Sequence, residues 1–233
     1  MTISAQLDQV RASIAEAAQH AGRNPASVAL LAVSKTFGPR AVIEAADAGQ
    51  REFGENYVQE VLEKIAAVKA SRPDLALVWH FIGPLQSNKT RAIAEQVDWV
   101  HSVDRLKIAQ RLSDQRPVHL PPLNICLQVN VSGEASKRGV RPDELLALAA
   151  AVTGLPRLRL RGLMAIPEPV ADPVLQRKPF AQLRQLQQQL GAIGIDTDTL
   201  SMGMSADVAA AIAEGATIVR IGTSIFGQRD YAH

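Results

Sequence analysis

The chain has 233 residues, of which 47% are hydrophobic and 21% are charged, and its formal net charge is +2. This balance provides no excess of basic residues to hold a polyanion by counterion release, so nucleic acid is not an expected partner. The N-terminus has no basic segment followed by an apolar one, and no run of about eighteen apolar residues occurs. We therefore expect a cytoplasmic protein without a membrane segment.

The first predicted element is an amphipathic helix. Its apolar residues recur at steps of three and four: Ile3, Leu7, Val10 and Ile14. Gly22 can end this helix in the left-handed conformation. Residues 28–35 (VALLAVSK) then form a short apolar run bounded by turn residues, which indicates a strand buried on both faces. A second helix is predicted to begin at Pro39 and to end at Gly49.

The same unit, a short strand followed by a loop and a helix, repeats along the rest of the chain. The eight predicted strands are residues 28–35, 51–56, 77–83, 98–103, 123–131, 158–166, 198–204 and 217–222. Alternation of this kind is typical of right-handed βαβ crossovers and a parallel sheet. Eight units without a break in composition predict a single (β/α)₈ TIM barrel domain over residues 1–233.

Two connections are longer than the others and rich in proline. They are residues 116–122 (RPVHLPP) and residues 167–179 (PEPVADPVLQRKP). Proline fixes its own backbone and restricts the residue before it, so we expect both connections to be rigid or extended surface loops.

Functional groups of such barrels gather at the carboxyl ends of the strands. Lys35 directly follows an apolar strand, where loss of water would favour the neutral amine that attacks a carbonyl group. The alternative is a lysine that extends from the strand end into solvent. Glu55, Asn56, His80 and Asn130 also lie in or after predicted strands. For Asn56 and His80, contact with a ligand ring and satisfaction of nearby backbone groups are both open.

The last two strands are followed by groups that suit phosphate. Ser205 is placed to cap a helix and carries a hydroxyl, while Gly222 and Thr223 open a short helix with free backbone amides. Plain capping and a tight turn are the alternative. Arg220 interrupts the apolar strand TIVRIG, where a guanidinium is costly unless it faces a ligand or pairs with a carboxylate such as Glu55.

Metal binding is not expected from this sequence. The histidines never fall four residues apart and form no cluster with cysteine: His20, His80, His101, His119 and His233. The sole cysteine, Cys126, lies in an apolar run, which favours a buried thiol in a reducing compartment.

Seven segments, in this order, closely resemble the pyridoxal phosphate homeostasis protein family, which is related to the barrel domain of alanine racemase (PLP fold type III). They are AVSKTF, FGENYVQE, WHFIGPLQSNK, VNVSGEASKRG, RGLMAIP, LSMGMSAD and VRIGTSIFG. The resemblance covers nearly the whole chain and implies pyridoxal 5′-phosphate (PLP) as the cofactor.

The resemblance also implies a role for individual residues. Lys35 would hold PLP as a Schiff base, Ser205 with the amides near Gly222 and Thr223 would hold the phosphate, and Arg220 would face the pyridine nitrogen. An arginine there would keep that nitrogen unprotonated and weaken the cofactor as an electron sink. The ring would be lined by Asn56, His80 and Met164. Lys137 resembles a loop lysine that accepts or relays cofactor, with a solvated surface lysine as the alternative.

A non-catalytic carrier is expected rather than an enzyme. Racemases of this fold use a tyrosine from an additional β domain as second acid–base group, whereas this sequence ends at His233 and its tyrosines are Tyr57 and Tyr231. We therefore expect a monomer that holds PLP, limits its free aldehyde and supplies PLP-dependent apo-enzymes. The alternatives are a small PLP-dependent amino acid racemase or decarboxylase, and a lysine Schiff-base aldolase.

Overall fold

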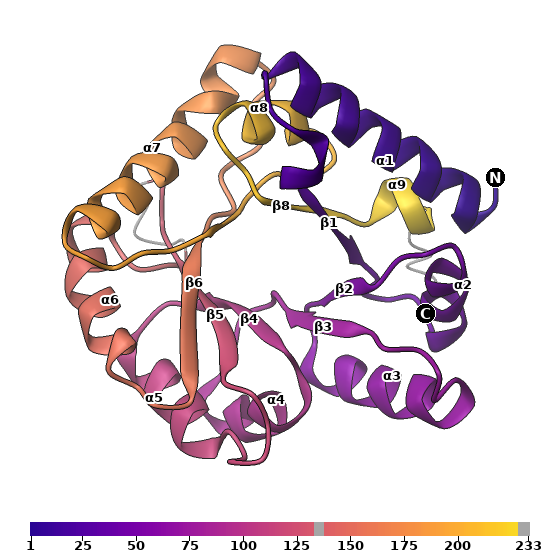
Figure 1. The fold of residues 1–233 in the computed structure, drawn as a ribbon, viewed down its shortest axis with the longest axis horizontal. Helices are drawn as coiled ribbons and strands as arrows, with labels where there is room; N and C mark the ends of the chain where they lie inside the picture. The colour runs from indigo at the N-terminus through magenta and orange to yellow at the C-terminus, as the bar shows by residue number, and fades with distance from the viewer. Residues whose placement is uncertain (133–137, 228–233) are drawn as a thin grey trace.

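In a computed structural model that describes residues 1–132 and 138–227, the strands form a closed barrel (Figure 1). Each strand pairs in parallel with the next, and the last pairs with the first. The strands are β1 (Ala29–Val33), β2 (Glu52–Glu55), β3 (Val78–Phe81), β4 (Trp99–Val103), β5 (Leu123–Gln128), β6 (Leu158–Met164), β7 (Thr199–Ser201) and β8 (Ile218–Ile221). This arrangement confirms the predicted (β/α)₈ TIM barrel, although most predicted strands run past the observed ends.

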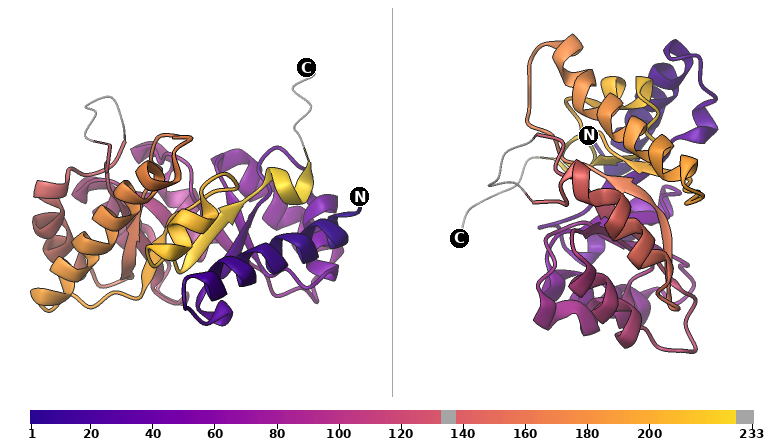
Figure 2. Two further views of the ribbon diagram at one scale, coloured as in Figure 1. Left: turned by 90° about the horizontal axis from the view of Figure 1, so that it is seen from above. Right: turned by 90° about the vertical axis from the view of Figure 1, so that its left-hand side faces the viewer.

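Helices form an outer ring around the barrel (Figure 1), and the side views in Figure 2 show them lying outside the strands. They are α1 (Ile3–His20), α2 (Pro39–Asp47), α3 (Val58–Ser71), α4 (Thr90–Gln96), α5 (Leu106–Gln115), α6 (Leu145–Thr153), α7 (Pro173–Ala192), α8 (Val208–Ala213) and α9 (Thr223–Phe226). Helix α9 has only four residues. Helix α1 packs between α8 and α2, so it fills the position of a full-length eighth outer helix (Figure 1). In the described ranges, no helix is long and apolar enough to span a membrane.

Local sequence signals predict the boundaries of α2 correctly and the start of α7 incorrectly. Helix α2 begins at Pro39, and Gly49 follows its end with a φ of 85°, as the glycine signal predicts. The loop predicted over residues 167–179 is wrong in its second half, because α7 begins at Pro173. The Asp172 side chain accepts hydrogen bonds from the first amides of this helix, and Pro173 suits its first turn, so the segment reads as a helix start.

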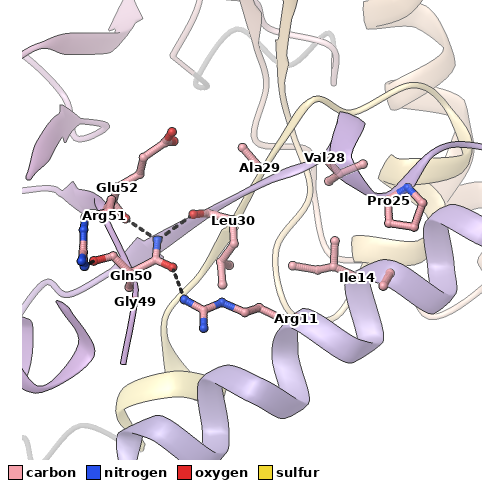
Figure 3. Close-up of a pocket in the computed structure, with 11 residues that line it drawn as sticks. Arg11, Ile14, Pro25, Val28, Ala29, Leu30, Gly49, Gln50, Arg51 and Glu52 are labelled. Atoms are coloured by element: carbon pink, nitrogen blue, oxygen red, sulfur yellow. Dashed lines mark hydrogen bonds between the residues drawn. The ribbon is translucent and has the colours of Figure 1, made fainter. Parts of the chain in front are cut away.

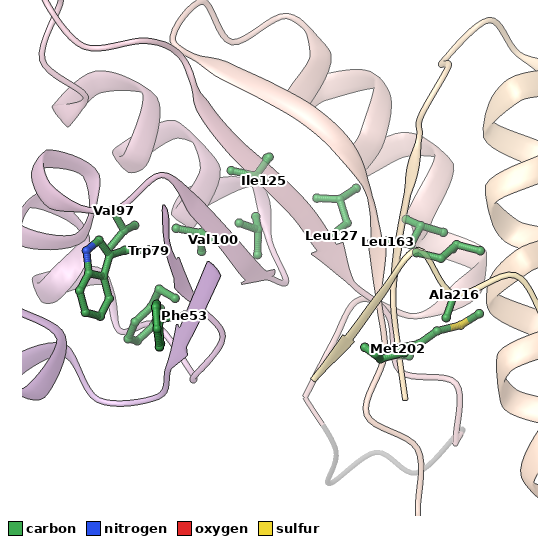
Figure 4. Close-up of a cluster of buried hydrophobic side chains, with 14 of the residues drawn as sticks. Phe53, Trp79, Val97, Val100, Ile125, Leu127, Leu163, Met202 and Ala216 are labelled. Carbon is green, nitrogen blue, oxygen red and sulfur yellow. The ribbon is translucent and has the colours of Figure 1, made fainter. Parts of the chain in front are cut away.

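The main core lies between the outer face of the barrel and the helices (Figure 4). Phe53, Val100, Leu127 and Met202 are completely or almost completely buried there. Side chains alternate across a strand, so the neighbours of these residues face the inside of the barrel. A separate apolar cluster of Leu31, Val33, Ile82 and Ile218 lies on that inner side. The interior of the barrel also contains buried polar side chains, among them His101, Ser201 and Arg220.

Candidate functional site

Lys35 directly follows β1 at the C-terminal end of the barrel, and its side chain is half-buried. The residues on both sides of it are fixed by hydrogen bonds. Ser34 donates its amide to the carbonyl oxygen of Gly54, and Thr36 donates its amide to Glu60 Oε1 at 2.5 Å. Thr36 has a φ of 71°, which is a strained conformation for a β-branched residue. The backbone that carries Lys35 is therefore held by its surroundings in one particular shape.

A buried lysine on α3 supplies much of this restraint. Lys64 Nζ donates to the carbonyl oxygen of Ser34 at 2.6 Å, to Glu55 Oε1 at 2.7 Å and to Glu60 Oε1 at 2.6 Å. Ser34 Oγ also donates to Glu55 Oε1, at 2.5 Å. Burial raises the pKa of Glu55, and the adjacent Lys64 ammonium works against that rise. This polar network connects α3 and β2 to the residue before Lys35.

Lys64 is not among the residues predicted from the sequence, although a signal for it exists. The buried positions of α3 are Val61, Lys64 and Val68. A lysine that occupies the apolar stripe of an amphipathic helix needs a buried partner, because an unpaired charge there is costly. Glu60 and Lys64 are four residues apart on one helix, and this spacing predicts Glu60 as one of the partners.

Arg220 lies inside the barrel on β8 and is 4% exposed. Its Nη1 donates to Ser201 Oγ at 2.8 Å, and its Nη2 donates to the carbonyl oxygen of Ala165 at 2.9 Å. Burial lowers the pKa of Arg220 to about 10, so it remains a cation at neutral pH. The alternative pairing with Glu55 is wrong, because Glu55 is bound by Lys64 and Ser34 instead.

The surroundings of Arg220 suit an electron-rich ligand. Among the ion pairs found within the described residues, none involves Arg220, and its two hydrogen bonds use two of its five N–H groups. The Asp207 carboxylate acts on Arg220 only at a distance beyond direct contact. A buried guanidinium without a direct anionic contact is costly, and a ligand atom with a free lone pair would reduce that cost. The pyridine nitrogen expected from the sequence is such an atom.

The segments expected to bind phosphate lie next to the loop of Lys35. A Cβ on Gly222 would stand 2.8 Å from the carbonyl oxygen of Val33, so only glycine lets β8 run this close to the end of β1. Helix α9 begins at Thr223, as predicted, and the first amides of a helix have no partner within it. Ser205 is exposed, and Ser224 Oγ donates to its hydroxyl at 3.4 Å. The prediction that Ser205 caps a helix is wrong, because α8 begins only after Asp207.

Three residues were expected around a ligand ring, and they lie at different depths. Asn56 follows β2, and its Oδ1 is buried without a hydrogen-bond partner within the described part of the chain, so it can accept from a ligand. Met164, at the end of β6, is fully buried and lies in register with Ser201. His80 lies deeper, where its ring stacks on Trp99 with centroids 5.2 Å apart.

The nitrogens of His80 face protein groups rather than the mouth of the barrel. Its Nδ1 lies 2.9 Å from His101 Nε2, and its Nε2 lies 3.7 Å from Glu52 Oε2. Burial lowers the pKa of His80 to about 3, so the imidazole is neutral at physiological pH. Any effect of His80 on a ligand therefore passes through its neighbours.

The predictions for Lys137 and Cys126 have different outcomes. Lys137, the expected loop lysine, lies outside the described residues, and so does Tyr231. Cys126 is fully buried, as predicted, and burial raises the pKa of its thiol to about 12. The thiolate that would react or bind metal is therefore not formed at neutral pH.

Among the cavities lined by the described residues, two lie at opposite ends of the barrel. One, of about 380 Å³, lies between α1 and the beginnings of β1 and β2 (Figure 3). Its polar groups bind one another, because Gln50 Nε2 donates to the carbonyl oxygens of Leu30 and Glu52, and Arg11 Nη2 donates to Gln50 Oε1. The other cavity, of about 730 Å³, opens beside Asn56 between α3 and α4 at the same end as Lys35.

Comparison with known proteins gives one family and several close relatives. Residues 5–230 match the family described as alanine racemase, N-terminal domain. The pyridoxal phosphate homeostasis protein of Pseudomonas aeruginosa is 64% identical over 230 residues, which cover 99% of this chain and 97% of that protein. The protein of the same name from Escherichia coli is 55% identical over 235 residues, covering 99% of this chain and 98% of its own length.

Solved structures agree with this result. PipY of Synechococcus elongatus, determined with PLP bound, superposes with a TM-score of 0.82 and 38% identity, covering 97% of this chain and all of PipY. A Bifidobacterium adolescentis protein described as unknown gives a TM-score of 0.90 with 36% identity, covering 96% of this chain and 94% of that one. Alanine racemase of Corynebacterium glutamicum, at 15% identity, shares the fold over 97% of this chain and 62% of the enzyme, with a TM-score of 0.67.

Proposed function

The chain belongs to the alanine racemase N-terminal domain family, and from that premise we propose that it binds PLP and acts in the homeostasis of this cofactor. Relatives over almost the entire chain carry the name pyridoxal phosphate homeostasis protein, and PipY binds PLP on the same fold. The observation that carries the proposal within this chain is the buried Arg220 cation, which makes no direct ion pair within the described residues and lies inside the barrel that bears Lys35 at its mouth.

Lys35 is the covalent anchor in this proposal. Its Nζ condenses with the aldehyde of PLP to a Schiff base, and one water molecule is released. The network of Lys64, Glu55 and Glu60 fixes the backbone on both sides of Lys35, so the base of the side chain that bears the amine is held in place. When bound, the cofactor supplies an electron sink and a reactive aldehyde.

The remaining contacts follow from the positions of the site residues. Ser205 and the amides of Gly222 and Thr223 hold the phosphate beside the end of β1. Arg220 donates to the pyridine nitrogen and, because it stays charged, keeps that nitrogen without a proton. Asn56 Oδ1 accepts a hydrogen bond at the mouth of the barrel, and Met164 contacts the ring from β6. His80 acts through the groups behind Arg220.

The proposed role is storage and delivery of PLP without catalytic turnover. A guanidinium at the pyridine nitrogen makes the ring a weaker electron sink, which disfavours chemistry at an amino acid Cα. The names of the relatives support homeostasis as the function. We further propose that the protein is a cytoplasmic monomer, that residues 1–233 form one domain, and that PLP-dependent apo-enzymes receive the cofactor.

Borohydride reduction tests the proposal directly. The protein incubated with PLP should show a visible absorption band at about 420 nm, and reduction followed by peptide mapping should place the modification on Lys35. The variant Lys35→Ala should lose both signals, whereas Lys69→Ala, on the exposed side of α3, should retain them. A modification found on a different lysine would contradict the proposed anchor.

Turnover assays separate the carrier from an enzyme. Incubation with a panel of amino acids should give no racemisation or decarboxylation, while transfer of PLP to an apo-enzyme should be measurable. Turnover of about 1 s⁻¹ or faster that disappears in Lys35→Ala would overturn the non-catalytic part of the proposal.

A further inference from the structure

A row of polar side chains crosses the inside of the barrel behind Arg220. Arg220 Nη1 lies 2.8 Å from Ser201 Oγ, and Ser201 Oγ lies 2.8 Å from His101 Nδ1. His101 Nε2 lies 2.9 Å from His80 Nδ1, and His80 Nε2 lies 3.7 Å from Glu52 Oε2. Short contacts thus join four residues from β8, β7, β4 and β3, and Glu52 on β2 lies just beyond their end, near the N-terminal mouth of the barrel.

The guanidinium end of this row fixes the direction of its first two hydrogen bonds. Arg220 is only a donor, so Ser201 Oγ must accept from it. The Ser201 hydroxyl hydrogen then needs an acceptor, and His101 Nδ1 lies within reach at 2.8 Å. If His101 Nδ1 carried a hydrogen instead, the buried Ser201 hydroxyl would lose its acceptor, which is unfavourable.

The two imidazoles continue the same donor-to-acceptor direction of hydrogen bonding. Burial lowers the pKa of both His101 and His80, so each ring is neutral and carries one hydrogen. With His101 Nδ1 as an acceptor, its hydrogen is on Nε2 and is donated to His80 Nδ1. The hydrogen of His80 is then on Nε2, which is buried and makes no hydrogen bond within the described residues.

Glu52 can serve as the acceptor that completes the row. It begins β2, and its side chain is 37% exposed, so the carboxylate has room to approach His80 Nε2 from 3.7 Å. In Figure 3 this carboxylate points away from Arg11 and Gln50, which line the neighbouring cavity. Partial burial raises the pKa of Glu52, and an N–H donor from His80 is a group that stabilises its anion.

We propose that Glu52, His80, His101 and Ser201 form one directional hydrogen-bonded chain that fixes the orientation of the Arg220 guanidinium, with every donor pointing from Arg220 towards Glu52. These four are positioning residues, because they act on a ligand only through Arg220. The consequence for PLP rests on the proposed function, whereas the chain of hydrogen bonds does not require the cofactor.

Nuclear magnetic resonance of the ¹⁵N-histidine-labelled protein tests the direction of the chain. In the wild-type protein, both His80 and His101 should carry hydrogen on Nε2 and none on Nδ1. A coupling across the hydrogen bond should join His101 Nε2 to His80 Nδ1. Hydrogen on Nδ1 of either residue, or doubly protonated rings at neutral pH, would overturn the proposal.

Variants of Ser201 test whether the chain holds Arg220. In Ser201→Ala, His101 should become a mixture of tautomers, and the guanidinium hydrogens of Arg220 should exchange with water faster. The matched control is Ser102→Ala, which removes another buried serine hydroxyl that donates to the carbonyl oxygen of Gly83. Equal effects in both variants would mean that the change is general loosening, which contradicts the proposal.

Variants of Glu52 provide an independent test if Ser201→Ala does not fold. Glu52→Gln retains an acceptor oxygen and should keep the Nε2–H form of His80. Glu52→Leu removes the acceptor, so the Nε2 hydrogen of His80 should exchange with water faster, while the tautomer stays as the Arg220 end sets it. An unchanged exchange rate of this hydrogen in Glu52→Leu would exclude Glu52 as the end of the chain.

Addition of PLP separates failure of the chain from failure of the proposed function. Wild-type protein and Ser102→Ala should show the same visible band, while Ser201→Ala should show a band shifted in the same direction as in Arg220→Ala. No band in wild-type protein with the expected tautomers would contradict the function alone. A band with different tautomers, or an unshifted band in Ser201→Ala, would contradict the chain or its effect on Arg220.

Discussion

Lys64 Nζ lies 2.6 Å from the carbonyl oxygen of Ser34, so a buried ammonium on α3 binds the residue directly before Lys35. Through Glu60, the same ammonium is connected to the amide of Thr36 on the other side of Lys35. The loop that carries the proposed anchor is therefore shaped by a charge network rather than by apolar packing alone.

Replacement of Lys64 should loosen this loop. In Lys64→Met the buried Glu55 loses its cationic partner, so the free energy of unfolding should fall by about 3–5 kcal/mol. Retention of PLP should fall as well, although Lys35 itself is unchanged. Denaturant titration and dialysis of the loaded protein measure these effects. Lys69→Met, on the exposed side of α3, is the control, and equal behaviour of the two variants would contradict a role for Lys64.

Removal of Arg220 should change the cofactor more than its retention. Arg220→Ala should still form the Schiff base on Lys35, with a shifted absorption spectrum, because the guanidinium no longer acts on the pyridine nitrogen. Absorption spectra before and after borohydride reduction give both results. Arg91→Ala, an exposed arginine on α4, should match the wild-type protein. An unshifted spectrum for Arg220→Ala would show that Arg220 does not face the ring.

Loss of the Ser205 hydroxyl should weaken the binding of PLP and leave its spectrum nearly unchanged, in contrast to loss of Arg220. Ser205→Ala removes one hydrogen bond to a charged phosphate, so the affinity for PLP should fall roughly tenfold or more with little change in the spectrum. Titration of the stripped protein with PLP measures this affinity. Ser71→Ala removes an exposed serine hydroxyl at the end of α3 and should have no effect. Equal affinities of the Ser205 and Ser71 variants would place the phosphate elsewhere.

The buried imidazoles should make the fold sensitive to mild acid. The unfolded chain protonates its histidines below about pH 6.5, whereas burial lowers the pKa of folded His80 to about 3. The unfolded state therefore binds more protons in this range, and the free energy of unfolding should fall by roughly 1.4 kcal/mol per pH unit for each such histidine as the pH drops below about 6.5.

Urea titrations at a series of pH values from about 7.5 to about 5 test this dependence. In the variant His80→Gln, the slope of the free energy of unfolding against pH should be smaller than in the wild-type protein by the contribution of one proton. Carboxylates contribute equally to the slopes of both proteins. His20→Gln changes an exposed histidine at the end of α1 and should keep the full slope. Identical slopes for all three proteins would show that His80 titrates freely in the folded state.

The order of helices and strands was predictable because it depends on local patterns in the sequence. Apolar runs such as residues 28–35, with turn residues on both sides, gave the strands, and the glycine and proline signals at Pro39 and Gly49 gave the ends of α2. Strand alternation with helices then gave the barrel. Pro173 was misinterpreted as part of a loop, because a proline in isolation is compatible with both a loop and the first turn of a helix.

The sequence by itself determined the barrel, the location of Lys35 after its first strand and the resemblance to a PLP-binding family. Only the tertiary structure decided that Glu55 binds Lys64 rather than Arg220, and that His101 and Ser201, one hundred residues apart, share a hydrogen bond. The reason is physical. Periodicity records which face of an element is apolar, whereas the partner of a buried polar group depends on which distant strands closure of the barrel brings together.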